Sequence, residues 1–227
     1  MIDKTPGGLS ENWIVWIREY AAIAARFVKE EPVPVSNEEE RELVALKAAL
    51  YARALTLFEG TLLLIENDRQ LEFRIQSRGV IEAAMYLIAL DRNPAFVSKM
   101  KDDDYKSRQA RASLHLKAPD LNVTADVRRM LEEFVAQGAQ GAKAIQVATL
   151  LEGSQFDRLY RTYRDISGDA AHVSVSSLNR HYIENPKDRA AILVVHPALD
   201  DVDLHMTATE LGISMTIATL ILMKIKE

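Results

Sequence analysis

Residues Arg69 to Asp91 read RQLEFRIQSRGVIEAAMYLIALD, and this stretch decides the fold. Val80 to Leu90 is almost continuously apolar, which predicts a helix largely buried in a core. Glu82 nevertheless stands inside the apolar run, and Arg78 precedes it by four residues. Residues four apart share one face of a helix, so these two side chains are expected to meet. A charge in an apolar environment needs a partner, which makes the pair a candidate site.

A second polar cluster lies far downstream, in residues 160–172, which read YRTYRDISGDAAH. Its titratable and nucleophilic groups are Tyr163, Asp165, Ser167, Asp169 and His172. We expect Arg78 and Glu82 to meet His172 in or beside the core, with Tyr163 and Ser167 lining the same place. The two clusters then form either one polar network or the walls of a site.

Both interpretations assign clear roles to the residues. In a structural role, Arg78 and Glu82 satisfy each other at a helix crossing, and His172 bonds a carbonyl or Glu82. In a functional role, Glu82 is a base or ligand anchor, and the planar guanidinium of Arg78 clamps an anion. His172 would then act as acid or base, because histidine titrates near neutral pH. The catalytic candidates are thus Arg78, Glu82 and His172, and Tyr163 and Ser167 are ligand-binding candidates.

Composition limits the class of protein. Of 227 residues, 48% are hydrophobic, while Gly (9) and Pro (7) are few, which favours long helices. A net charge of −5 argues against a general nucleic-acid binder. The lack of cysteine excludes disulfides and thiolate chemistry. The start of the chain does not resemble a secretory signal. The apolar run 211–223 is shorter than a bilayer requires, so we expect a core helix, no membrane contact and a cytoplasmic location.

Hydrophobic spacing, caps and prolines predict a mainly α fold, an up-down bundle of six to eight helices. Ser36 and Glu39 are expected to form a capping box, and Gly60 to mark a close helix crossing. The fifth helix contains glycines at 138 and 141 and is expected to kink or split there. The predicted helices span residues 10–30, 36–66, 69–91, 94–115, 124–151 and 155–167, and Asp200-Asp201 and Thr207 or Thr209 lead into a last helix.

The only strand-like segment of the sequence lies near residues 181–196. His181 to Glu184 and Ala190 to His196 are the two strands, and residues 185–188 (NPKD) suit the turn between them. This predicts a small β-hairpin attached to the helical body. Residues 1–9 are expected to be a flexible tail, and residues 10–227 a single helical domain.

Two short motifs resemble a known family. The helical motif RGVIEAA and the later motif YRDISGDAAHVS resemble motifs of a bacterial family catalogued as domain of unknown function 5677. The resemblance spans roughly residues 48–182 and implies a helical fold and a candidate site, but no reaction. The chain has Val173 where the family usually has proline, and its gap from serine to histidine is wider. The matching positions are Arg78, Glu82, Tyr163, Ser167, His172 and Ser174.

A remoter resemblance is to the small helical RNA-acting domains of prokaryotic toxin and phage-defence systems. Their ribonuclease members carry an arginine and, after four to six residues, a histidine. Arg108 and His115 fit this spacing, whereas Arg164 and His172 are one residue too far apart. Nearby basic residues would hold a phosphate backbone, although a charged run on a helix is more often a solvated face. These basic residues are Lys101, Lys106, Arg111 and Lys117.

No motif in the sequence calls for a metal or cofactor. Residues 196–205 hold two histidines among acidic residues, yet they also read as an acidic loop before a helix. No glutamate has a histidine three residues later, the spacing of di-iron bundles, and no Gly-rich phosphate loop follows a strand. We therefore expect no metal and no cofactor.

Two classes of function follow. The first is a binding or interaction module with a buried Arg–Glu–His cluster, acting within a stress or phage-defence system and holding a small anionic ligand. The second is a metal-independent ribonuclease or phosphotransfer enzyme, in which histidine is the acid–base and arginine stabilises charge on RNA. The acidic balance favours the first class, and the sequence leaves open whether the protein is an enzyme. An apolar stripe left uncovered on two long helices would suit a homodimer.

Overall fold

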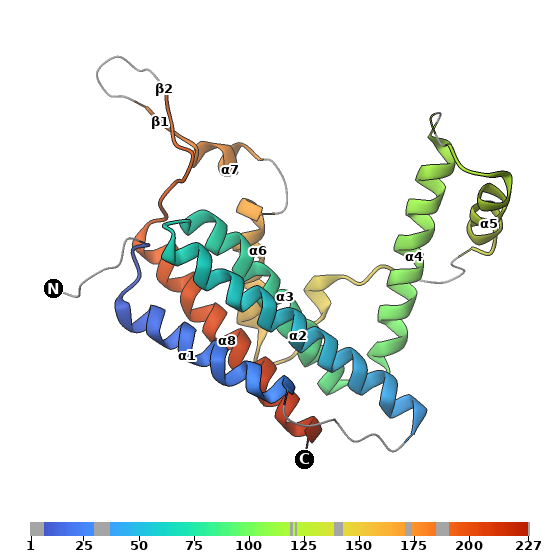
Figure 1. Cartoon of the computed structure of the whole chain (residues 1–227), viewed down its shortest axis with the longest axis horizontal. Helices are drawn as coiled ribbons and strands as arrows, with labels where there is room; N and C mark the ends of the chain where they lie inside the picture. The colour runs from blue at the N-terminus through green and yellow to red at the C-terminus, as the bar shows by residue number, and fades with distance from the viewer. Residues whose placement is uncertain are drawn as a thin grey trace. The chain divides into compact units, whose positions relative to one another are not determined.

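The computed structural model describes residues 7–29, 37–118, 120, 122–138, 143–170, 174–184 and 191–226. Within them the chain forms eight α-helices, one 3-10 turn and a two-stranded hairpin (Figure 1). The predicted mainly α bundle with a small hairpin is therefore confirmed. The chain divides into two compact units, residues 1–92 with 150–227, and residues 93–149. The prediction of a single domain over residues 10–227 stays a prediction.

The first unit is a bundle built around one central helix. That helix, α3, packs against α2, α6 and α8, while α2 also packs against α1 and α8 (Figure 1). The bundle helices are α1 (Glu11–Lys29), α2 (Glu38–Glu66), α3 (Gln70–Arg92), α6 (Asp157–Ala170) and α8 (Asp201–Lys226). Residues 69–91, quoted at the start, thus contain α3, which packs against three of the other four bundle helices.

Helices α2 and α3 form the predicted antiparallel hairpin. The corner is tight because Asn67 ends α2 and Asp68 adopts a left-handed backbone with φ of 55°. At its other end α2 is capped by Asn37, whose side chain accepts the N–H of Glu40 at 2.8 Å. The predicted cap, Ser36, lies outside the described residues.

Glycines allow α2 and α3 to approach closely. A Cβ added at Gly60 would lie 2.8 Å from Gln76, and one at Gly79 would lie 2.8 Å from Leu57. The expected close crossing at Gly60 is therefore confirmed, and Gly79 is its counterpart on α3. Around this crossing the core is fully closed, with Phe58, Phe73 and Met85 each at 0% exposure.

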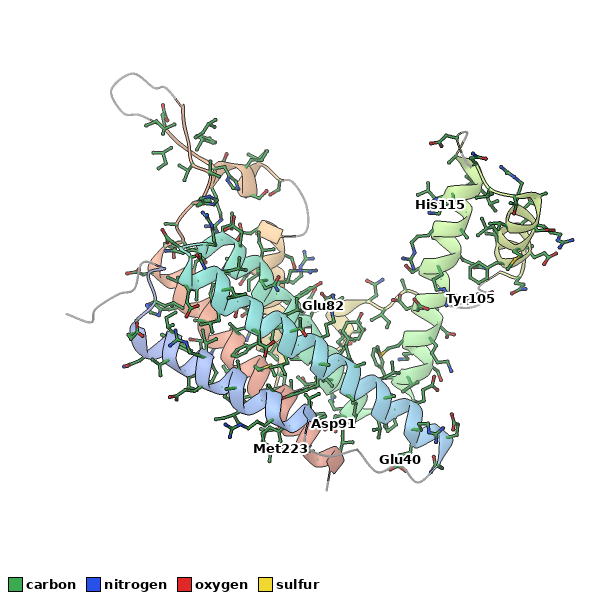
Figure 2. The ribbon with its side chains drawn as sticks, viewed as in Figure 1. Glu40, Glu82, Asp91, Tyr105, His115 and Met223 are labelled. Atoms are coloured by element: carbon green, nitrogen blue, oxygen red, sulfur yellow. The ribbon has the colours of Figure 1, made fainter. Side chains whose placement is uncertain are left out.

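One carboxylate joins three helices at the end of α3. Asp91 accepts a hydrogen bond from Lys47 of α2 and another from Lys224 of α8, both at 3.1 Å (Figure 2). One turn further along α2, the Tyr51 hydroxyl donates to the Ala24 carbonyl of α1 at 3.1 Å. These contacts fix the lengthwise position of the bundle helices.

A short helix and the hairpin lie between α6 and α8. Helix α7 (Val175–Asn179) was not predicted, and Ser174 caps it through a capping box with Ser177. Strands β1 (Tyr182–Glu184) and β2 (Ala191–Leu193) pair antiparallel, Ile183 opposite Ile192, as expected for a hairpin. The predicted turn at 185–188 lies outside the described residues. At the chain's start, Leu9 is fully buried, so packing begins before Ser10.

The second unit holds α4 (Phe96–Lys117), α5 (Ala125–Ala136) and a 3-10 turn at Val147–Thr149. Its two helices are joined by Tyr105 against Phe134, with ring centroids 5.1 Å apart, and by Gln109, which donates to the Phe134 carbonyl. The prediction of one helix over residues 124–151 is wrong beyond Ala136. Gly138 adopts a φ of 64°, which ends the helix where a kink or split was expected.

Two helices are long and apolar enough to cross a membrane by length and composition, within residues 40–66 and 201–225. Buried core helices of water-soluble proteins have the same length and composition. About 61% of the apolar segment of α8 is buried inside the bundle.

We expect Asp91→Asn to lower the free energy of unfolding by roughly 1 kcal/mol near neutral pH, because two partly screened charge-assisted bonds are lost. Burial raises the pKa of Asp91, but the bonds and charges of Lys47 and Lys224 outweigh it and leave the pKa below its ordinary value. The carboxylate therefore stabilises the fold above the unfolded-state pKa, and this contribution is lost as pH falls through the lower folded-state pKa.

Urea unfolding of parent and Asp91→Asn, from about pH 7 to about pH 2, checks this. The stability difference should shrink toward acid, and a difference that stays constant would contradict it. Asp104→Asn is the matched control, because that carboxylate is 61% exposed and pairs with Arg108 on the surface.

Candidate functional site

The Arg78 cluster lies where α3 crosses α6 and consists of Arg78, Glu82, Tyr163 and Ser167. Arg78 Nε donates to Ser167 Oγ at 2.9 Å, Nη1 donates to Glu82 Oε2 at 3.4 Å, and Nη2 donates to the Tyr163 hydroxyl. The Tyr163 hydroxyl in turn donates to Glu82 Oε1 at 3.5 Å. The structure therefore brings together four residues that sequence reasoning placed in one site.

This cluster is less buried than the apolar run around it suggested. The side chains of Arg78 and Glu82 are 23% and 32% exposed. Burial and the neighbouring charge of Glu82 raise the pKa of Tyr163, which keeps its hydroxyl protonated and able to donate. The three bonds from Arg78 use three of its five N–H donors, and its side chain is 23% exposed. The remaining N–H groups are chemically suited to a carboxylate or phosphate oxygen.

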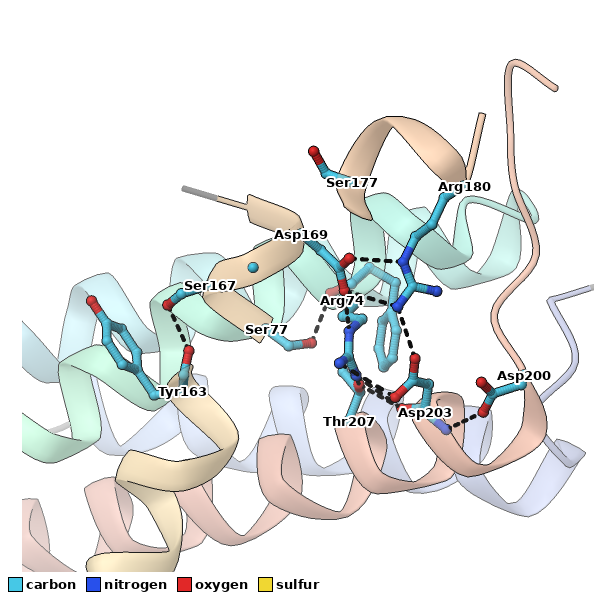
Figure 3. A network of polar contacts seen from close by, with 12 residues as sticks. Arg74, Ser77, Tyr163, Ser167, Asp169, Ser177, Arg180, Asp200, Asp203 and Thr207 are labelled. Carbon is cyan, nitrogen blue, oxygen red and sulfur yellow. Dashed lines mark hydrogen bonds and ion pairs between the residues drawn. The ribbon is translucent and has the colours of Figure 1, made fainter. Parts of the chain in front are cut away.

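The fully buried arginine is Arg74, one turn before Arg78. Its side chain is 3% exposed, and Nε donates to Asp169 Oδ2 at 2.8 Å (Figure 3). Nη1 donates to the Thr207 hydroxyl at 2.9 Å, and Nη2 lies 3.3 Å from Asp203. Arg180 completes this Arg74 network with bonds to Asp169 at 2.7 Å and Asp203 at 2.9 Å.

The Arg74 network balances its charge internally, with two arginines against two aspartates. Burial lowers the pKa of Arg180, but its bonds to Asp169 and Asp203 outweigh this and raise the pKa, so the guanidinium stays charged. The network joins α3 and α6 to the residue after α7 and to the first turn of α8 (Figure 3). Such mutual satisfaction is typical of a structural network.

Sequence reasoning overlooked Arg74, although a signal was present. Gln70, Arg74, Arg78 and Glu82 recur every fourth residue and so form one polar stripe along α3. The first of them is 7% exposed and accepts the N–H of Leu199 at 2.7 Å. Along this stripe the side chains therefore change from buried at Gln70 to partly exposed at Glu82.

A buried glutamate on α8 also escaped the sequence analysis. The Glu210 side chain is 1% exposed and pairs with Arg158 of α6, whose own side chain is 63% exposed. One turn further along α8, the Ser214 hydroxyl is buried without a hydrogen-bond partner in the described part of the chain. Both residues are buried on the side of α8 that faces the bundle; Ser214 lies within the apolar run 211–223, and Glu210 directly precedes it.

The other candidates have separate positions. His172 lies outside the described residues, so its expected meeting with Glu82 stays a prediction. Arg108 and His115 both lie exposed on α4 in the second unit, and Arg108 pairs with Asp104. Figure 2 labels His115 on this helix. The described residues contain no group of three or more His, Asp or Glu side chains placed to hold a metal ion. Asp203, from the acidic loop considered for metal, is instead a partner of Arg74.

An open hollow of about 690 Å³ lies between α1 and α8, and we refer to it as the α1–α8 groove. Trp13 and Trp16 line it from α1, and Ile213 and Ile217 from α8. Polar groups at its edge come from Ser10, Asn12, Thr209 and Thr216. Its volume and mixed lining resemble those of small-molecule sites, which typically enclose about 300–1,000 Å³.

The tryptophans of the groove are held in place by neighbouring aromatic rings. Trp16 stacks on Tyr20 at 5.0 Å and meets Phe58 edge-on at 6.2 Å, which fixes its indole against the core. A Cβ added at Gly212 would lie 3.0 Å from the Trp16 ring, so glycine is needed for this close approach. Trp13 meets Trp16 edge-on at 5.8 Å. The groove is therefore a preformed surface with two supported aromatic rings.

Comparison with known proteins finds one family. The profile described as Family of unknown function (DUF5677) matches residues 44–190, more than half of the chain. The match covers α3 and α6, and so the whole Arg78 cluster, whereas Asp203 and Thr207 of the Arg74 network lie beyond it on α8. No curated protein and no solved structure shows a significant match to the chain.

We expect Arg74→Met to lower the free energy of unfolding by about 3–5 kcal/mol, because Asp169 and Asp203 would then share the single charge of Arg180 and leave one negative charge uncompensated in a largely buried place. Arg78→Met should cost only about 1 kcal/mol, since its cluster reaches solvent and water can replace the lost bonds. Urea unfolding of both variants beside the parent measures the two costs. Equal losses would contradict the distinction between a structural network and a solvent-reaching cluster.

Proposed function

The chain belongs to the family of unknown function DUF5677, and we propose that it is a binding module whose ligand occupies the α1–α8 groove. The observation that carries this proposal is the groove itself, about 690 Å³ in volume and lined by Trp13 and Trp16. Tryptophan offers a large apolar surface whose burial stabilises a ligand, and its ring is rigid. We propose a small molecule with an apolar body as the occupant.

The lining favours a small molecule over a chance surface depression. The Ile213 side chain is 40% exposed beside the groove, where a ligand would remove it from water. Thr209 and Thr216 line the same wall, and each hydroxyl donates to the carbonyl four residues earlier, so its oxygen can accept a hydrogen bond from a polar group of the ligand. A few polar groups among apolar walls are the usual composition of a ligand site.

The polar clusters support this function by holding the frame. Helix α8 is bonded to α3 near both ends of α8. Thr207 accepts a hydrogen bond from Arg74, and Lys224 donates one to Asp91. The groove wall on α8 lies between these two points. The Arg78 cluster, whose arginine side chain is 23% exposed, stays a proposed second contact for a small anion.

Ribonuclease or phosphotransfer chemistry is the second candidate function, and one observation favours it. Arg108 and His115 are seven residues apart on α4, which places them on one face about two turns apart, and both are exposed. Arg111 and Lys117 are exposed on the same helix and add positive charge. A phosphodiester bound there would meet an acid–base group and a charge-stabilising group.

The binding proposal is tested with phenylnaphthylamine, a neutral apolar dye that absorbs where tryptophan emits. The chain has two tryptophans, Trp13 and Trp16, and both line the groove, so a bound dye should quench the intrinsic fluorescence. Ile213→Lys should weaken dye binding about tenfold, because it places a charge in the apolar wall. Leu63→Lys is the matched control, since Leu63 is 64% exposed on α2 and lies outside the groove lining. Equal affinity of parent and Ile213→Lys would contradict the proposal.

The second candidate is tested with a labelled single-stranded RNA. If the α4 face cleaves phosphodiesters, His115→Ala should reduce the rate by about a hundredfold or more, as loss of an acid–base group does. His205→Ala, on α8 in the other unit, should leave the rate unchanged. Cleavage that survives His115→Ala, or no cleavage by the parent, removes this candidate.

A further inference from the structure

A smaller hollow adjoins the α1–α8 groove on the other side of Ile217. It has a volume of about 170 Å³, and Ile217 lines both hollows. Phe156, Leu220 and Ile221 give it apolar walls. Unlike the groove, it also has charged residues in its lining, Asp91, Arg92 and Lys224.

The two hollows follow one stripe of α8. Ile213, Ile217, Leu220 and Lys224 are spaced by four, three and four residues, which places them on one helix face. Ile213 and Leu220 are 40% and 55% exposed, so the stripe presents apolar surface to solvent. The part of α8 that lines the two hollows runs from Thr209 to Lys224 and is about 22 Å long along the helix axis. This is an elongated apolar path that ends at a charged group.

The charged end carries an excess of positive charge. Lys47 and Lys224 both bond to Asp91 at 3.1 Å, so two cations share one carboxylate. Arg92 adds a third cation, and its two terminal nitrogens lie 3.5 Å from the Glu152 carbonyl, the outer limit of a hydrogen bond. This end therefore attracts an anion, although the chain as a whole has a net charge of −5.

We infer that the α1–α8 groove and this basic end form one site for a free amphipathic anion. Its apolar chain lies along Ile213, Ile217 and Leu220, and its carboxylate or phosphate head meets Arg92 and Lys224. A guanidinium beside an ammonium suits such a head, because their N–H groups replace its hydration. Positive charge at only one end excludes a cationic amphipath and orients the anion. This inference rests on the proposed function, because it names the ligand class of the same groove.

The test compares three ligands with the same dodecyl chain: dodecanoate, dodecanol and dodecyltrimethylammonium. Each is titrated as a monomer into the full chain at low salt, with tryptophan fluorescence and displacement of phenylnaphthylamine as readouts. Dodecanoate should bind about tenfold more tightly than dodecanol, because its head gains charge-assisted bonds. The cationic amphipath should bind more weakly than the alcohol. Added salt should reduce only the preference for the anion.

Variants at the basic end separate the head from the chain. In the double variant Arg92→Gln/Lys224→Gln, dodecanoate should bind no more tightly than dodecanol, while dodecanol keeps its affinity. Both side chains are on the surface side of the hollow, and Lys224 is 65% exposed, so the fold should persist. Arg129→Gln is a charge control, since Arg129 is 68% exposed on α5 in the other unit.

The outcomes distinguish this inference from the function it rests on. Equal binding of all three amphipaths would keep the groove as a ligand site and overturn the anionic ligand. Absence of binding by both the dye and the amphipaths would overturn the groove function as well. A response to vesicles of anionic phospholipid without any response to monomeric dodecanoate would make the surface a membrane contact and overturn the inference.

Discussion

Burial of the Arg74 guanidinium is the constraint on which the rest of the bundle depends. Arginine cannot lose its proton within a protein, so a side chain that is 3% exposed must be given fixed anionic partners. The partners, Asp169 and Asp203, come from α6 and α8, and Arg180 from the end of α7 neutralises the charge that remains. Four segments distant in sequence must therefore meet at one point. An apolar contact between the same helices would permit sliding, whereas bonds with defined directions do not.

This constraint also explains how a ligand surface is kept open on the other side of α8. The helix is bonded to α3 near its first turn at Thr207 and near its last turn at Lys224. Between these points it contributes one wall of the α1–α8 groove, and Gly212 admits the ring of Trp16. Because α8 is fixed near both ends, the groove exists before any ligand arrives. Preformed sites cost less ordering entropy on binding, which is consistent with a binding module.

Much of the helical architecture was predictable, because periodicity and helix-ending residues are local properties. The two long helices over residues 36–66 and 69–91 and the crossing at Gly60 followed from the sequence. The fifth helix was predicted too long, because the glycines at 138 and 141 were expected to kink or split it, whereas α5 ends at Ala136 and Gly138 adopts a left-handed backbone. Helix α7 was missed because a five-residue helix carries too few residues to show periodicity.

The sequence by itself determined that Arg78 and Glu82 share one helix face and that a distant polar segment must supply further partners. Only the tertiary structure decided which arginine is buried, because burial depends on what α6 and α8 place over each turn of α3. Arg74 and Arg78 have the same spacing and chemistry, yet one meets two aspartates and the other reaches solvent. The α1–α8 groove likewise joins helices from opposite ends of the chain, and no local pattern encodes a space between side chains.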